Sequence, residues 1–192
     1  MTFSTLAAAL SGIMTWSFLE YVIHRWLGHD RRWVRKTVFG VEHTAHHSKG
    51  NYFAPWWKKA LAAAAAMALA LPLSVLVFGW SLGFIYSVSF ASFYLVYELV
   101  HRSLHVWQGV GPYARWARRH HFFHHFHDPA KNHGVTSPLW DVVFGTFASP
   151  RQIHVPEKLA MRWLVDPATG DVRESLMADY ALRPAKAGSP PH

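Results

Sequence analysis

Histidine is the residue type whose spacing in this sequence most clearly predicts chemistry. Four segments read HRWLGH, HTAHH, HRSLH and HFFHH. Residues three and four apart share one face of a helix, so several imidazoles in each segment can point to one place. Ten of the fifteen histidines fit this scheme, and we predict that they bind metal: His24, His29, His43, His46, His47, His101, His105, His121, His124 and His125.

Ten histidines predict a site with two metal ions. Imidazole binds iron, zinc, copper and nickel, and one ion rarely accepts more than six ligands. His24 and His29 are five residues apart, which places them about 140° apart around a regular α-helix. We therefore expect a helix end or a local distortion at this point. No catalytic residue is predicted beyond the metal ligands.

The composition limits the other possible functions. The absence of cysteine excludes disulfides, cysteine-ligated iron–sulfur clusters, thiolate-bound haem and cysteine nucleophiles. The chain has 19 Lys and Arg against 11 Asp and Glu, a net charge of +8, which in a soluble protein would suggest a nucleic-acid partner. However, residues 2–19 and 60–97 contain no charged side chain, and such runs are typical of membrane-spanning helices. We expect no nucleic-acid partner.

These runs predict an all-α integral membrane protein with about three transmembrane helices and a helical cap that holds the dinuclear histidine site. The transmembrane helices are expected at about 3–23, 60–79 and 82–101, and the cap at 24–59 and 102–148. The basic residues and the ten histidines lie on the same side of these helices. By the positive-inside rule that side is cytoplasmic.

Two carboxylates are predicted to orient metal-binding imidazoles. Glu20 lies four residues before His24, and Glu98 lies three before His101. A carboxylate commonly accepts the second ring N–H of a metal-bound histidine. Two roles are open for Asp141, which either orients a histidine of the last segment or begins a helix.

The remaining histidines are not predicted to bind metal. His120 is the one rival ligand, but the HxxHH spacing fits only from His121. Surface positions are expected for His127, His133, His154 and His192. Residues 149–182 are predicted to form a cytoplasmic tail with two short helices, at 156–164 and 172–182, and a turn at 166–170. The composition of residues 183–192 predicts disorder.

The four histidine segments, followed by NHGVTSPLWDVVFGT, resemble the fatty acid hydroxylase superfamily, which also contains sterol desaturases. The resemblance covers about residues 19–146 and is to short bacterial members. It implies a multi-pass protein of the bacterial inner membrane and a non-haem di-iron oxygenase. Two iron ions would be held by the ten histidines, although zinc can replace iron in a purified sample. It also implies O₂ as oxidant and C–H hydroxylation of a lipid or fatty acyl chain from the bilayer.

Some members of this superfamily have a further transmembrane hairpin, and some have a fused cytochrome b5 domain with an HPGG sequence. The sequence contains neither. Electrons are therefore expected from a separate donor of the ferredoxin or cytochrome type, which the basic cytoplasmic face would suit. The missing helices would also be compatible with an oligomer.

Three alternatives remain open. A lipid or sterol desaturase would use the same site and remove a second hydrogen. A carotenoid ring hydroxylase is expected to have HxxxxH as its third segment, whereas residues 101–105 are HxxxH. A histidine-rich membrane metal transporter or metal-binding protein belongs to another class. A transporter would place ionisable ligands near the middle of the membrane, where this chain has only Ser, Thr, Gly and Pro as non-hydrophobic residues.

Overall fold

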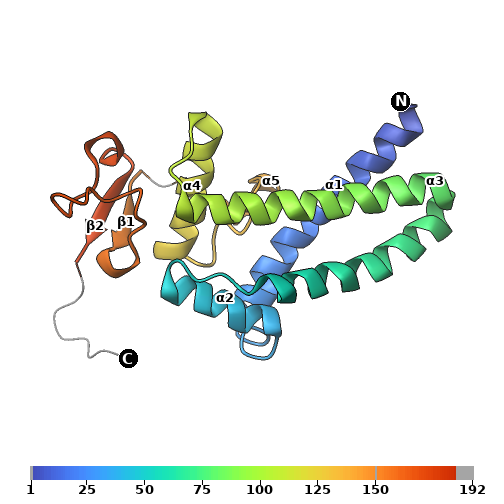
Figure 1. Cartoon of the computed structure of the whole chain (residues 1–192), viewed down its shortest axis with the longest axis horizontal. Helices are drawn as coiled ribbons and strands as arrows, with labels where there is room; N and C mark the ends of the chain where they lie inside the picture. Colours follow the sequence, from blue (N-terminus) through green and yellow to red (C-terminus); the bar gives the residue numbers. More distant parts are fainter. Residues whose placement is uncertain (1, 150, 185–192) are drawn as a thin grey trace.

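The computed structural model describes residues 2–149 and 151–184. Two long apolar helices lead to a set of shorter helices and a small tail (Figure 1). Helix α1 spans Phe3–Val22 and begins after Thr2, whose Oγ1 accepts a hydrogen bond from the Thr5 N–H at 3.2 Å. It continues directly into a π-helix at Ile23–Gly28.

Helix α3 spans Trp56–Val106 and reverses its direction at Gly79 (Figure 1). Gly79 has a φ of 76° and a ψ of 169°, a conformation that favours glycine because it lacks a Cβ. Near this turn Ser74 Oγ donates to the Gly83 carbonyl at 2.9 Å. A Cβ on Gly83 would lie only 2.5 Å from the Val75 nitrogen, so the two arms touch through their backbones. The non-helical residue thus lies at the end of the range that was predicted for the second helix, about 60–79.

Helix α1 packs along α3 through a small residue and a ring cluster. A Cβ on Gly12 would lie 2.3 Å from the Tyr86 carbonyl oxygen, so glycine permits the close approach. Four residues on, Trp16 packs edge-on against Phe90 and Tyr94, with ring centroids 5.5 and 4.8 Å away. By length and composition, Phe3–Gly28 and Trp56–Val106 are each able to cross a membrane.

Three shorter helices complete the part of the chain that carries the histidines. Helix α2 spans Val38–Lys49, α4 spans Gly111–Phe126 and α5 spans Leu139–Val143. The Thr37 Oγ1 accepts from the Gly40 N–H at 3.0 Å and starts α2. Helix α5 packs on α1 through aromatic pairs, such as Phe18 with Trp140 at a centroid distance of 4.9 Å.

The tail differs from its prediction. The two helices expected at 156–164 and 172–182 are absent from this region, all of which is described. Instead, strand β1 (Ile153–Pro156) pairs in parallel with strand β2 (Tyr180–Arg183), and two 3₁₀ turns lie at Glu157–Leu159 and Glu174–Leu176. The expected turn at 166–170 is present, closed by the Gly170 N–H donating to the Asp166 carbonyl at 2.8 Å.

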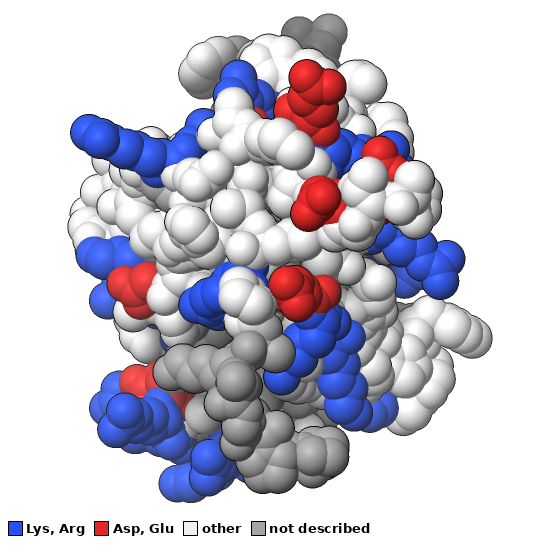
Figure 2. Space-filling model, turned by 90° about the vertical axis from the view of Figure 1, so that its left-hand side faces the viewer, with Lys and Arg blue, Asp and Glu red and all other residues white. Residues whose placement is uncertain are grey.

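Alternating burial explains the strands. Ile153 and Val155 are fully buried while His154 between them is exposed, as predicted for that histidine. The two buried residues join a tail core that is completed by Phe122 and Phe126 of α4, and this contact favours extended chain over helix. The protein is thus mostly helical rather than all-α. Most of the segment predicted to be disordered, residues 185–192, lies outside the described residues, and so does His192 within it. Figure 2 views the molecule from its tail end.

Candidate metal centre

The ten predicted ligands come together as two groups of five. Within each group, every histidine offers a ring nitrogen that lies within 4.8 Å of those of the others. Opposite ligands of a single ion with metal–nitrogen bonds near 2.1 Å would lie about 4.2 Å apart, so each group has the dimensions of one metal site. Neither group contains a carboxylate. The π-helix group comprises His24, His29, His43, His47 and His124. The α3 group comprises His46, His101, His105, His121 and His125.

The π-helix group depends on irregular backbone. His24 lies inside the π-helix and His29 directly follows it. Hydrogen bonds in a π-helix join residues five apart, which brings these two histidines onto one face with ring centroids 5.3 Å apart. The local distortion expected from their spacing is therefore confirmed. Gly28 makes room for the next ligand, because a Cβ there would lie 2.9 Å from His43 Cδ2.

The α3 group uses regular helices only. His101 and His105 lie one turn apart near the end of α3, His121 and His125 lie one turn apart on α4, and His46 comes from α2. Nε2 of His105 lies 2.9 Å from Nε2 of His121. Two neighbouring ligands of one ion would need a separation of about 3 Å. Phe53 packs beside this group, 5.1 to 6.0 Å from three of its rings.

The two groups share a boundary. The rings of His47 and His125 stack with their centroids 3.9 Å apart and their planes within 2° of parallel. Helices α2 and α4 each contribute residues to both groups.

Backbone carbonyls, not carboxylates, aim three of the imidazoles. Nδ1 of His24 donates to the His133 carbonyl at 2.5 Å, Nδ1 of His46 to the Tyr52 carbonyl at 2.6 Å, and Nδ1 of His124 to the Lys131 carbonyl at 2.7 Å. A carbonyl only accepts, so Nδ1 carries the proton and Nε2 keeps its lone pair for another partner. Sequence reasoning missed these acceptors because any residue can supply a carbonyl.

Both carboxylates predicted to orient a histidine have other partners. Glu20 accepts hydrogen bonds from the Val135 and Thr136 N–H groups at 2.5 and 2.9 Å and from Thr136 Oγ1 at 2.8 Å. Glu98 forms an ion pair with Lys59. Residues three or four apart share a face of a helix, but this spacing does not decide which group the carboxylate contacts. Glu20 therefore anchors the loop after α4 to α1.

Asp141 fulfils only one of the two roles that the sequence left open: it lies at the start of a helix, but the ring that it contacts is His120 and not a histidine of the last segment. It lies in the first turn of α5 and accepts from the His133 and Gly134 N–H groups, each at 2.8 Å. Its Oδ2 is also 3.2 Å from Nε2 of His120. These hydrogen bonds hold the pKa of Asp141 far below its ordinary value, although burial raises it. Asp141 thus orients His120, which lies outside both groups.

His133 was predicted on the surface, and that prediction is wrong. Its side chain is 2% exposed, and its ring lies 5.6 Å from that of His24 and 5.3 Å from that of His124. The available signal was the Asn-His-Gly sequence after the last histidine segment. Asn132 has a φ of 56° and accepts from the Ala148 N–H at 2.7 Å, which turns His133 inward. His127 is exposed, as expected.

The chemistry of the ten side chains suits a metal. Burial lowers the pKa of His29 and His46 to about 4 and holds the pKa of His43, His124 and His125 well below its ordinary value. The imidazoles are thus neutral at physiological pH and can act as ligands. Among the described residues, four buried Nε2 atoms have no hydrogen-bond partner: those of His24, His47, His124 and His125. Uncompensated buried nitrogens are costly, and a bound cation would satisfy them.

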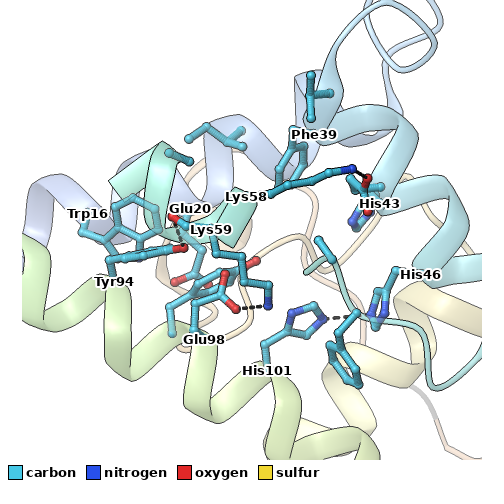
Figure 3. Close-up of a pocket in the computed structure, with 17 residues that line it drawn as sticks. Trp16, Glu20, Phe39, His43, His46, Lys58, Lys59, Tyr94, Glu98 and His101 are labelled. Carbon is cyan, nitrogen blue, oxygen red and sulfur yellow. Dashed lines mark hydrogen bonds and ion pairs between the residues drawn. The ribbon is translucent and has the colours of Figure 1, made fainter. Parts of the chain in front are cut away.

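An apolar cavity of about 270 Å³ adjoins both groups. His43 of the π-helix group and His46 and His101 of the α3 group line it, and its apolar walls include Trp16 and Phe39 (Figure 3). Two ion pairs lie at its edge, Lys58 with Glu42 at 2.5 Å and Lys59 with Glu98. A chain of methylene groups would fit such walls.

Fold and site together define a mostly helical protein with two apolar helices able to span a membrane and two histidine groups able to hold metal. The family model of fatty acid hydroxylase matches residues 9–146. The chain belongs to the fatty acid hydroxylase family.

Similar proteins have names that agree with this family. A dihydroceramide fatty acyl 2-hydroxylase, FAH2 of Arabidopsis thaliana, is 31% identical over 70% of this chain and 58% of its own length. The ceramide very long chain fatty acid hydroxylase scs7 of Schizosaccharomyces pombe is 32% identical over 70% of this chain and 40% of its own. The chain thus spans about three fifths or less of these relatives.

One solved structure also resembles this chain. Full-length scs7p, with only its hydroxylase domain visible, has a TM-score of 0.60 at 24% identity, over 77% of this chain and 59% of that one. At this identity the likeness establishes the fold.

Proposed function

We propose that this protein is a membrane-bound non-haem di-iron oxygenase that hydroxylates an unactivated C–H bond of a lipid or fatty acyl chain. The observation that carries the proposal is the position of the apolar cavity, which is lined by histidines of both groups. One iron would be held by the π-helix group and the other by the α3 group. The names of the relatives, which refer to hydroxylation of fatty acyl chains, support the same reaction.

Two bound irons would supply the activation of O₂ that organic side chains do not provide. In the reaction, one oxygen atom is inserted into the C–H bond and the other leaves as water, with two electrons and two protons consumed. The histidines fix the positions of both ions, and the carbonyls of His133, Tyr52 and Lys131 hold three imidazoles in the tautomer that leaves Nε2 free. Trp16 and Phe39 exclude water and align the acyl chain.

We propose that the chain crosses the bacterial inner membrane three times, with α1 and the two arms of α3. The cavity has walls from both helices, so a lipid would reach it sideways from the bilayer. The basic segments flanking the histidines support a cytoplasmic position for the site and the tail. O₂ and a separate electron donor complete the reaction.

The test measures metal and lipid in one preparation. The protein is expressed in cells supplied with iron, metals per chain are counted, and membrane acyl chains are analysed by mass spectrometry. We expect about two irons per chain and a hydroxylated lipid. Both are expected to be lost in the H124A/H125A variant and retained in H154A, whose histidine is exposed and outside both groups. A new double bond instead of a hydroxyl would identify a desaturase. Absence of stoichiometric metal would refute the proposal.

A further inference from the structure

A second hollow shares one lining residue with the apolar cavity. Phe53 lines both spaces. The second hollow has a volume of about 550 Å³, and its walls include Asn51, Tyr52, Arg102, His105 and Arg162. We call it the cationic hollow, because it is lined by two arginines and by no carboxylate.

The arginines of the cationic hollow are available to an external anion. Arg102 and Arg162 are exposed, and within the described part of the chain neither forms an ion pair. The guanidinium of Arg102 lies over the Phe53 ring at 4.9 Å. Lys49 lies over the ring of Tyr52, which also lines the hollow, at 5.5 Å. Lys and Arg predominate among the charged side chains on the face shown in Figure 2.

Two other spaces in the described part of the chain differ in charge. At the apolar cavity, Lys58 and Lys59 are neutralised by Glu42 and Glu98. A third hollow is lined by Arg115 and Arg119, which both pair with Asp179. Its one histidine, His120, faces Asp141 and belongs to neither metal group. The cationic hollow thus combines unpaired arginines with a direct approach to a metal group.

That approach is short. His105 lines the cationic hollow and is a member of the α3 group. Phe53 also lines the hollow, and its ring centroid lies within 6.0 Å of those of His46, His101 and His105. A redox group seated against this wall would be separated from the α3 group by one layer of side chains.

We propose that the cationic hollow is the docking site for an acidic one-electron carrier protein, an inference that rests on the proposed function. Carboxylates around the redox group of the carrier would pair with Arg102 and Arg162, and the charge would accelerate association. Two carriers are each oxidised by one electron per turnover. These two electrons, with two protons, reduce one atom of O₂ to water while the other enters the C–H bond. Lipid and reductant would thus use two different hollows that share Phe53.

The test compares two double charge reversals in the full chain, reconstituted in nanodiscs. R102E/R162E changes the cationic hollow, and R31E/R35E changes two exposed arginines in the loop before α2 as a matched control. The probes are the soluble haem domain of cytochrome b5 and a plant-type [2Fe–2S] ferredoxin. At low salt, at least one probe is expected to bind the unmodified protein, with an affinity that falls as salt rises. R102E/R162E should weaken binding about tenfold or more, and the control less than about twofold.

A second measurement separates this proposal from the proposed function. Dithionite, a small reductant that needs no docking site, replaces the carrier in a lipid-oxidation assay. R102E/R162E should keep its metal and its dithionite-driven activity. Unchanged carrier binding by R102E/R162E, or no binding of either probe by the unmodified protein, would overturn the docking proposal. Normal carrier binding with loss of dithionite-driven activity would do the same and would indicate a lipid headgroup site. No oxidation by the unmodified protein even with dithionite would count against the proposed function instead.

Discussion

The two histidine groups have the same number of ligands but are built differently. The α3 group draws its ligands from three regular helices and is backed by the Phe53 ring. The π-helix group needs a π-helix, a glycine in contact with His43 and a loop whose carbonyls aim two of its rings. Two sites with the same number of histidine ligands can therefore depend to different degrees on residues that are not ligands. We therefore expect the π-helix group to be the more sensitive to changes outside its ligands.

The largest effects should come from removing one ligand of each group. H29A should remove the metal of the π-helix group, and H105A that of the α3 group, because each leaves only four imidazoles. Affinity at the affected site should fall by more than about 100-fold. Metal content after dialysis is expected to fall from about two to about one per chain in either variant. Loss of both metals from a single variant would show that the groups do not bind independently.

The next effect concerns the loop that supports only the π-helix group. Asp141 is fully buried and accepts from the His133 and Gly134 N–H groups. D141N removes the charge and one acceptor, and should weaken metal binding in the π-helix group by about 10- to 100-fold. The rate of metal release to a chelator measures this change in affinity. Release is expected in two phases, one for each group, and the H29A and H105A variants identify which phase belongs to which group. If D141N accelerated metal release equally from both groups, the loop would not support the π-helix group alone.

A smaller effect is expected at Gly28. In G28A the new methyl group would lie 2.9 Å from His43 Cδ2. The fold can accommodate this by moving the imidazole, and that movement should weaken the π-helix group about tenfold while the α3 group keeps its metal. T44A, at the exposed neighbour of His43 on α2, is the control. Wild-type rates of metal release in G28A would show that the His43 ring can move without weakening metal binding.

The smallest effect should come from the tail and reach the other group. Trp163 Nε1 donates to the His105 carbonyl at 3.1 Å. W163F keeps an aromatic ring but loses this hydrogen bond and part of the buried ring, at an expected cost of at least about 1 kcal/mol in unfolding free energy. Thermal unfolding measures that cost, and metal release from the α3 group should quicken by a few-fold. A change confined to the π-helix group would contradict the assignment of the tail to the α3 side.

Helical spacing made much of the site predictable. It identified all ten histidines that form the two groups in the structure. It also predicted the helix distortion that lies between His24 and His29. It could not find His133, because the turn at Asn132 that buries it depends on contacts with Ala148 and Asp141. The roles of Glu20 and Glu98 were misjudged because neighbours on a helix were taken as contacts. The partner of Glu20 lies 115 residues away.

The apolar runs and the break near Gly79 were also readable from sequence, since charge and glycine are local signals. The tail was not. Strands of four residues leave a weak pattern, and β1 forms only where Ile153 and Val155 meet Phe122 and Phe126. Helix α4 offered these rings between its histidines, so the tail fold depends on a partner about 30 residues earlier.

That dependence has a consequence for biosynthesis. Phe122 and Phe126 share a helix with His121, His124 and His125, and they are covered by residues as late as Tyr180. During translation the long helices are complete well before the tail has left the ribosome, since synthesis proceeds at about 5–20 residues per second. Helix α4 acquires its backing only after that delay. The backing of the helix that carries three of the ten histidines is thus completed by the last described part of the chain to be synthesised.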